Sequence, residues 1–136
     1  MSEAPSSSVS SYRFNEGSAT PRLVTASLPN GQGAACWIAV TPNGRLAFSA
    51  NAATSTVSSF NVAANGALSL VSGPAGSTGA NAGALDMAVS PDGSQLHVFA
   101  HRGLLIVSFA IAPGGLLQPL GSAAGLPSGA AGLAAN

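Results

Sequence analysis

Very few side chains in this sequence could carry out chemistry, and two of them, His101 and Arg102, stand next to each other. The chain of 136 residues has four arginines, no lysine, four acidic residues and two histidines. A histidine can act as a base near neutral pH, and an arginine can hold a carboxylate or a phosphate. Asp86 could lie near this pair. The sequence therefore predicts His101, Arg102 and Asp86 as candidate catalytic residues, against the simpler interpretation of a polar loop and a turn cap.

The remaining reactive residues favour structural roles. Cys36 is the single cysteine, which excludes an internal disulfide and a zinc site built on cysteines. A catalytic thiol would need a basic partner, and both histidines belong to a later part of the chain. His97 stands in an aromatic position and is predicted to pack. The turns at Asn43 and Asp92 hold too few carboxylates for calcium, so we expect no cofactor and no metal.

The composition excludes several classes of partner. Charged residues make up 6% of the chain, and the formal net charge is zero. Nucleic acids and anionic membranes require a basic surface, so neither is an expected partner. No apolar stretch reaches the roughly 18 residues that a membrane span needs, and the N-terminus lacks the pattern of a secretory leader. Nothing assigns a compartment; cytoplasmic is the default expectation, and a longer parent protein could be exported.

An internal repeat organises the chain. The segment CWIAVTPNGRLAFSANAATSTVSSFNV, from Cys36, superposes on LDMAVSPDGSQLHVFAHRGLLIVSFAI, from Leu85, with an offset of 49 residues. Each copy contains short apolar runs separated by Pro-Asn-Gly or Pro-Asp-Gly, which are tight-turn sequences. A period of this length is typical of propeller blades. The sequence therefore predicts an all-β fold with four strands in each repeat.

The repeat also predicts where the blades begin and end. In the first full unit the strands are expected near residues 35–40, 45–50, 55–62 and 68–72, and in the second near 84–89, 95–100, 104–110 and 116–120. Residues 8–26 are predicted to be a partial blade, and residues 1–7 to be disordered or the end of a truncated strand. Residues 130–135 are predicted to be an inner closing strand. The expected fold is a partial β-propeller with two complete blades and two partial blades, which cannot close a ring alone.

The repeat in this sequence resembles the repeat of a known family. TPNGRLAFSANAATSTVSSFNVAANGALSLV is similar to the repeat of lactonase-type seven-bladed β-propellers, and GQGAACWIAVTPNG resembles a bacterial branch of them. That family includes 6-phosphogluconolactonases and relatives of carboxymuconate-lactonising enzymes. The resemblance covers nearly all of residues 8–136 and implies the C-terminal third or so of a propeller. The repeat is specific for the fold and weak for the reaction.

The predicted architecture gives the candidates a common face. Loops that join strand two to strand three, and one blade to the next, lie at one end of a propeller near its axis. His101 and Arg102 fall in such a loop, where the preceding repeat has Ala52 and Ala53. We therefore expect any ligand to contact His101, Arg102 or the segment 73–86, whose glycine-rich part is predicted to be a flexible loop. Trp37, which aligns with Asp86, is predicted to cover the central channel or a neighbouring blade.

Three functions remain open from the sequence. The chain could be a fragment of a lactonase-like propeller whose parent hydrolyses a sugar lactone or a related organic-acid lactone, so that its partner is a small lactone or carboxylate. It could instead be a non-enzymatic scaffold for binding, or an inactive truncated product. Uncovered blade faces and the low charge also predict self-association.

Overall fold

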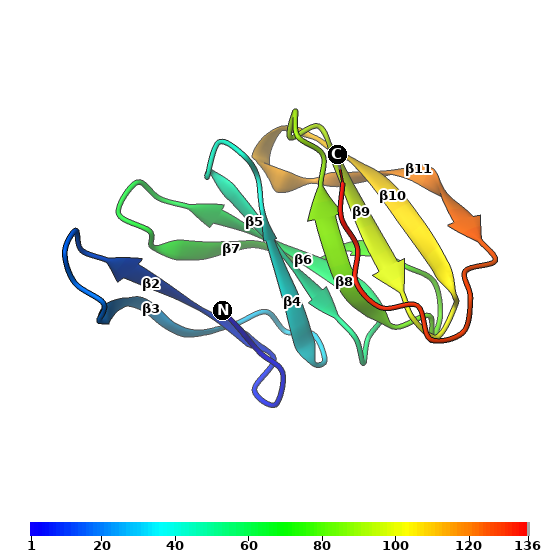
Figure 1. The fold of residues 1–136 in the computed structure, drawn as a ribbon, viewed down its shortest axis with the longest axis horizontal. Coiled ribbons are helices and arrows are strands. Elements are labelled where there is room, and N and C mark those ends of the chain that lie inside the picture. The colour runs from blue at the N-terminus through cyan, green and yellow to red at the C-terminus, as the bar shows by residue number, and fades with distance from the viewer. Residues whose placement is uncertain (136) are drawn as a thin grey trace.

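The computed structural model describes residues 1–135, which form eleven strands in three antiparallel sheets (Figure 1). The first sheet has three strands, in the order β1-β2-β3, and the other two have four, in the orders β4-β5-β6-β7 and β8-β9-β10-β11. The strands are β1 (Ser2–Glu3), β2 (Ser8–Phe14), β3 (Pro21–Pro29), β4 (Ala35–Val40), β5 (Leu46–Asn51), β6 (Thr56–Val62), β7 (Leu68–Ser77), β8 (Ala84–Val89), β9 (Gln95–Ala100), β10 (Leu105–Ile111) and β11 (Leu117–Ala124).

Each sheet is a meander in which successive strands pair with one another. The sheets stack side by side, with β4 and β8 as the inner strands of the two complete blades (Figure 1). The only helical element among residues 1–135 is a 3-10 turn at Pro113–Gly115. The all-β, partial-propeller fold predicted from the repeat is therefore confirmed.

Equivalent turns close the first hairpin of each complete blade. In the turn between β4 and β5, the Gly44 N–H donates to the Thr41 carbonyl at 2.8 Å, and Gly44 has a φ of +68° that favours glycine. In the turn between β8 and β9, the Asp92 carboxylate accepts hydrogen bonds from the Ser90 hydroxyl and from the Ser94 backbone and hydroxyl. These bonds, with Ser90 first, lower the pKa of Asp92 to about 2. The repeated Pro-Asn-Gly and Pro-Asp-Gly sequences thus end β4 and β8 in the same way.

Aromatic side chains fill the two interfaces between blades. Phe48 and Phe109 lie in a cluster between the second and third sheets, together with Val57, Leu96 and Val98. Phe60 lies in a smaller cluster between the first and second sheets. Burying one side chain of this size stabilises a fold by about 1.5–3 kcal/mol. Blade-to-blade packing of these side chains therefore holds the sheets together.

Two outer strands are longer than predicted. β7 continues to Ser77 and β11 to Ala124, so Gly73–Ser77, predicted to be part of a loop, belongs to a strand. β7 follows β6 through register shifts on either side of Ser59, after which Thr56 still pairs with Ser77. The irregular register and the pairing with β6 overrule the weak strand propensity of glycine and serine.

The two ends of the chain differ from one another. β1 pairs with Ser8 and Val9 of β2, and hydroxyls of Ser10, Ser27 and Ser6 donate to the Glu3 carboxylate. These bonds, with Ser10 first, lower the pKa of Glu3 and attach the N-terminal arm to its blade.

Residues 130–135 form no strand, contrary to the prediction of an inner closing strand. The C-terminal segment turns back toward β8 instead (Figure 1). Its Leu126 N–H donates to the Leu104 carbonyl at 3.1 Å, and its Leu133 N–H donates to the Asp86 carboxylate at 2.8 Å. A bond to a side chain does not make a ladder, so this segment crosses the blade without extending the sheet.

Candidate functional site

His101 and Arg102 lie in the turn that follows β9, at the end of the third blade where ligands were expected. The His101 Nδ1 atom is 2.9 Å from the Gly83 carbonyl oxygen. Because a carbonyl can only accept, Nδ1 carries the proton in this contact and Nε2 is the basic nitrogen of the neutral ring. The contact therefore fixes the ring in the tautomer that could take a proton through Nε2.

Arg102 connects two neighbouring blades. Its Nε donates to the Asn81 carbonyl at 3.0 Å, and its Nη2 donates to the Ala52 carbonyl of the preceding blade at 2.6 Å. A guanidinium has five N–H donors, so these two bonds orient the group and leave donors for a ligand. The exposed position of Arg102 would let a carboxylate or phosphate reach it from solvent.

The side chains of His101 and Arg102 pack closely against Gly83. Its φ is +73°, and a Cβ atom there would lie 2.6 Å from His101 Cε1 and 3.0 Å from Arg102 Cζ. Any side chain at position 83 would push both groups away. The close packing of His101 and Arg102 on the loop before β8 thus depends on this glycine.

Asp86 forms no hydrogen bond with His101 or Arg102. Its carboxylate accepts hydrogen bonds from two backbone N–H groups, Met87 at 2.6 Å and Leu133 at 2.8 Å, and the residue is 5% exposed. It lines a pocket of about 470 Å³ that neither His101 nor Arg102 lines. The loop face brings the predicted histidine and arginine together, whereas Asp86 belongs to a second location.

That second location, here called the axial pocket, lies between the inner strands β4 and β8. The pocket is lined by Cys36, Trp37, Leu85, Asp86, Ala131 and Gly132. The pairing of each inner strand with its neighbour shifts register at the same place in the repeat, between Ala35 and Trp37 and between Ala84 and Asp86. Such irregularities redirect side chains and are common beside functional sites. Trp37 is 49% exposed at this pocket, near the predicted central channel.

The sequence analysis missed a buried polar network at the loop end of the second blade. Asn51 is fully buried, accepts from Asn30 Nδ2 at 2.8 Å, and donates to Ser58 at 2.9 Å and Thr56 at 3.1 Å. Thr56 in turn donates to the Gln32 side chain at 2.9 Å. This network holds the loop that enters the second blade against β5 and β6.

A signal for this network was present in the repeat. The residues that align with Ser49, Asn51 and Ser58 in the next blade are Val98, Ala100 and Val107. A polar set that replaces an apolar set at buried positions predicts a hydrogen-bonded cluster, because buried polar groups require partners.

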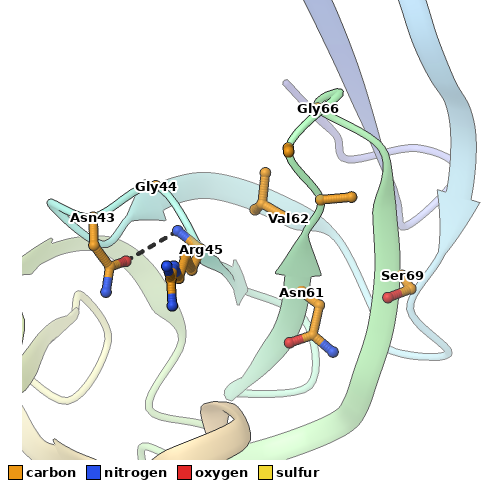
Figure 2. A pocket seen from close by; sticks show the side chains of 9 residues that line it. Asn43, Gly44, Arg45, Asn61, Val62, Gly66 and Ser69 are labelled. Atoms are coloured by element: carbon orange, nitrogen blue, oxygen red, sulfur yellow. Dashed lines mark hydrogen bonds between the residues drawn. The ribbon is translucent and has the colours of Figure 1, made fainter.

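The opposite end of the second blade carries an open groove of about 700 Å³, shown in Figure 2. It is lined by residues of the turns after β4 and β6, and the Arg45 backbone N–H donates to Asn43 Oδ1 at 3.0 Å within it. Its side chains are mainly exposed, and Arg45 is the one ionisable group that lines it. This groove lies at the end where no ligand was expected.

The remaining candidate residues have local contacts. His97 Nδ1 is 2.9 Å from the Ser108 hydroxyl on the adjacent strand. Cys36 is half-buried and unbonded to another cysteine. Over the described residues, histidine, cysteine and acidic side chains nowhere gather in a group of three or more that could hold a metal ion. In the same range no helix has the length and apolar character that crossing a membrane would require.

Comparison with solved structures identifies the fold of the chain. The chain superposes on a candidate 6-phosphogluconolactonase from Bacteroides fragilis with a TM-score of 0.71 and 21% identity, covering 86% of this chain and 33% of the other. A candidate 6-phosphogluconolactonase from Bacteroides uniformis gives a TM-score of 0.72 with 20% identity, covering 91% and 37%. A functionally unknown protein from Desulfotomaculum acetoxidans gives 0.70 with 20% identity, covering 88% and 36%.

These likenesses show that the chain has the fold of a β-propeller segment, and it spans about a third of the length of the structures it matches. The resemblance to lactonase-type propellers that the repeat predicted is confirmed at the level of the fold. No family model and no curated protein sequence matches the chain.

Proposed function

We propose that this chain is the substrate-facing part of a lactonase-like propeller, and that the parent protein opens a sugar lactone or a related organic-acid lactone. The observation that carries the proposal is the His101–Arg102 pair seated on Gly83, with the Nε2 side of the imidazole basic and guanidinium donors beside it. Neighbours described as candidate 6-phosphogluconolactonases support the substrate class.

The proposed reaction assigns one task to each side chain. His101 Nε2 takes a proton from water as the water oxygen adds to the lactone carbonyl carbon. Arg102 stabilises the developing oxyanion, or holds a carboxylate or phosphate of the substrate. The ring C–O bond then breaks, the alkoxide takes the proton back from His101, and a hydroxy acid leaves. Asp86 lines the axial pocket without His101 or Arg102, and this reaction assigns it no step.

The test is hydrolysis of gluconolactone and 6-phosphogluconolactone, measured against the spontaneous rate. We expect the His101→Gln variant to lose the catalysed rate and the His97→Gln variant, whose ring bonds Ser108 inside a sheet, to keep it. Equal rates for the wild-type chain and His101→Gln, with the ligand still bound, would favour the alternative of a non-enzymatic binding scaffold. Absence of both binding and turnover would favour an inactive product.

We also propose that the chain associates with a second copy of itself through its first blade. Phe14 is 67% exposed there, beside the exposed Tyr12 and Leu23. β1 pairs only with Ser8 and Val9, so the outer half of β2 has an open edge. An open edge beside apolar side chains favours strand pairing between chains, and a net charge of zero does little to oppose it.

A further inference from the structure

The axial pocket combines one buried negative charge with one large aromatic surface. Trp37 and Asp86 occupy equivalent positions in the repeat, and each follows a register shift in its inner strand. The two side chains line the same pocket of about 470 Å³, which Leu85 and the C-terminal segment at Ala131 and Gly132 complete. Strands of two blades and a third segment thus line a single open pocket that holds a carboxylate and an indole.

The charge of Asp86 is not balanced by a cationic side chain in the described part of the chain. Both of its hydrogen bonds come from backbone N–H groups, one to each oxygen. A carboxylate has about four acceptor positions, so acceptor capacity remains. Arg102 donates to backbone carbonyls of the loop face, and no arginine lines the axial pocket. A buried carboxylate without a counter-ion favours a cationic ligand.

Trp37 supplies the complementary surface. An indole face is the best aromatic partner for an organic cation, and the ring is half-exposed at the mouth of the pocket. Leu85 and Ala131 provide apolar contacts for the carbon atoms of such a ligand. The pocket therefore offers charge, a ring face and an apolar wall to the same molecule.

We propose that the axial pocket binds a small organic ammonium cation, with the ammonium group between the Asp86 carboxylate and the Trp37 ring. This binding goes beyond the proposed lactone hydrolysis and does not depend on it, because His101 and Arg102 do not line the axial pocket. A neutral sugar ring stacked on Trp37 is the competing occupant, and the experiment separates the two.

The chain carries its own probe for this test, because Trp37 is its single tryptophan. Indole fluorescence is followed while n-butylammonium chloride or tetramethylammonium chloride is added, with sodium chloride holding the ionic strength constant. We expect a saturable change with a Kd of roughly 1–10 mM, since one carboxylate and one ring face hold the ligand. n-Butanol and the neutral polyol inositol should give no saturable change.

Substitutions at Asp86 and Trp37, with a control at Asp92, test the assigned contacts. Asp86→Asn removes the charge at nearly constant shape and should weaken ammonium binding at least tenfold, whereas Asp92→Asn, which alters an exposed carboxylate at the opposite end, should leave it unchanged. For chains without tryptophan, binding is followed by broadening of the ligand methyl NMR signals. Trp37→Phe should keep a measurable part of the affinity, and Trp37→Leu should lose it.

Three outcomes would overturn the proposal. The first is equal binding of n-butanol and n-butylammonium, and the second is binding of inositol in preference to either cation. The third is unchanged ammonium binding in Asp86→Asn. Asp86 bonds the Leu133 N–H, so Asp86→Asn could lose its fold. In that case the comparison of Trp37→Phe with Trp37→Leu decides, and equal affinities of those two variants for the ammonium ligand would overturn the proposal.

Discussion

Replacing Gly83 by alanine is the most direct test of how the His101–Arg102 pair is positioned. The new Cβ atom would lie 2.6 Å from His101 Cε1 and 2.8 Å from Nδ1, so the ring must move and its bond to the Gly83 carbonyl must lengthen or break. The φ of +73° adds strain of about 1–2 kcal/mol for a non-glycine residue. Loss of the hydrogen bond adds about 0.5–1.5 kcal/mol.

A matched control is available at Gly44. Its φ of +68° is similar, but nothing lies within 4 Å of the Cβ that alanine would add. Gly44→Ala should therefore show the backbone strain alone. We expect Gly83→Ala to lower the free energy of unfolding more than Gly44→Ala does, and the difference is the cost of displacing the His101 ring. For a chain of this size, each kcal/mol of that difference lowers Tm by about 3–5 °C.

The assay combines a thermal melt followed by circular dichroism, at low protein concentration, with ¹⁵N NMR of the imidazole ring. In the wild-type chain the ring signals should report a proton on Nδ1, and in Gly83→Ala they should shift toward a mixture of tautomers. Equal losses of stability in the two variants, with unchanged ring signals, would show that Gly83 does not position His101 and Arg102.

Three further predictions concern the rest of the chain. Asn51→Ala should lower the free energy of unfolding, measured by chemical denaturation, by about 2–3 kcal/mol because Asn30 and Ser58 lose buried partners. Adding Ser49→Val and Ser58→Val, the residues found in the next blade, should recover part of that loss, and no recovery would contradict the network. Asp92 has a depressed pKa in the folded chain, so its contribution to stability should be present above pH 4 and lost as the pH falls toward 2; Asp92→Asn should flatten this acid limb, and an unchanged limb would speak against it. Phe14→Lys should shift light scattering after size exclusion toward the monomer; a wild-type chain that is already a monodisperse monomer would refute self-association.

Much of the fold could be predicted because the same pattern of strands and turns occurs twice in the sequence. The inner strands β4 and β8 occupy the predicted residues 35–40 and 84–89, because short apolar runs end at Pro-Asn-Gly and Pro-Asp-Gly turns whose hydrogen bonds are local. Local turn chemistry and strand periodicity depend on neighbouring residues alone. The adjacency of His101 and Arg102 was likewise visible in the sequence.

Other features depended on contacts between distant segments. The extension of β7 through glycines and serines to Ser77 follows from register shifts against β6, which no local propensity predicts. The strand predicted at residues 130–135 was also wrong, because a strand requires a ladder of backbone hydrogen bonds, and the Leu133 N–H donates to the Asp86 side chain instead.

The sequence by itself determined the blade unit, its hairpin turns and the scarcity of reactive groups, since each is set by residue type and spacing along the chain. The tertiary structure decided which of those groups meet. It placed Arg102 against the carbonyl of Ala52 in the preceding blade, and it placed Asp86 in a pocket that His101 does not line. Residues 49 positions apart become neighbours only when blades pack, and that packing brings Trp37 to the same pocket as Asp86.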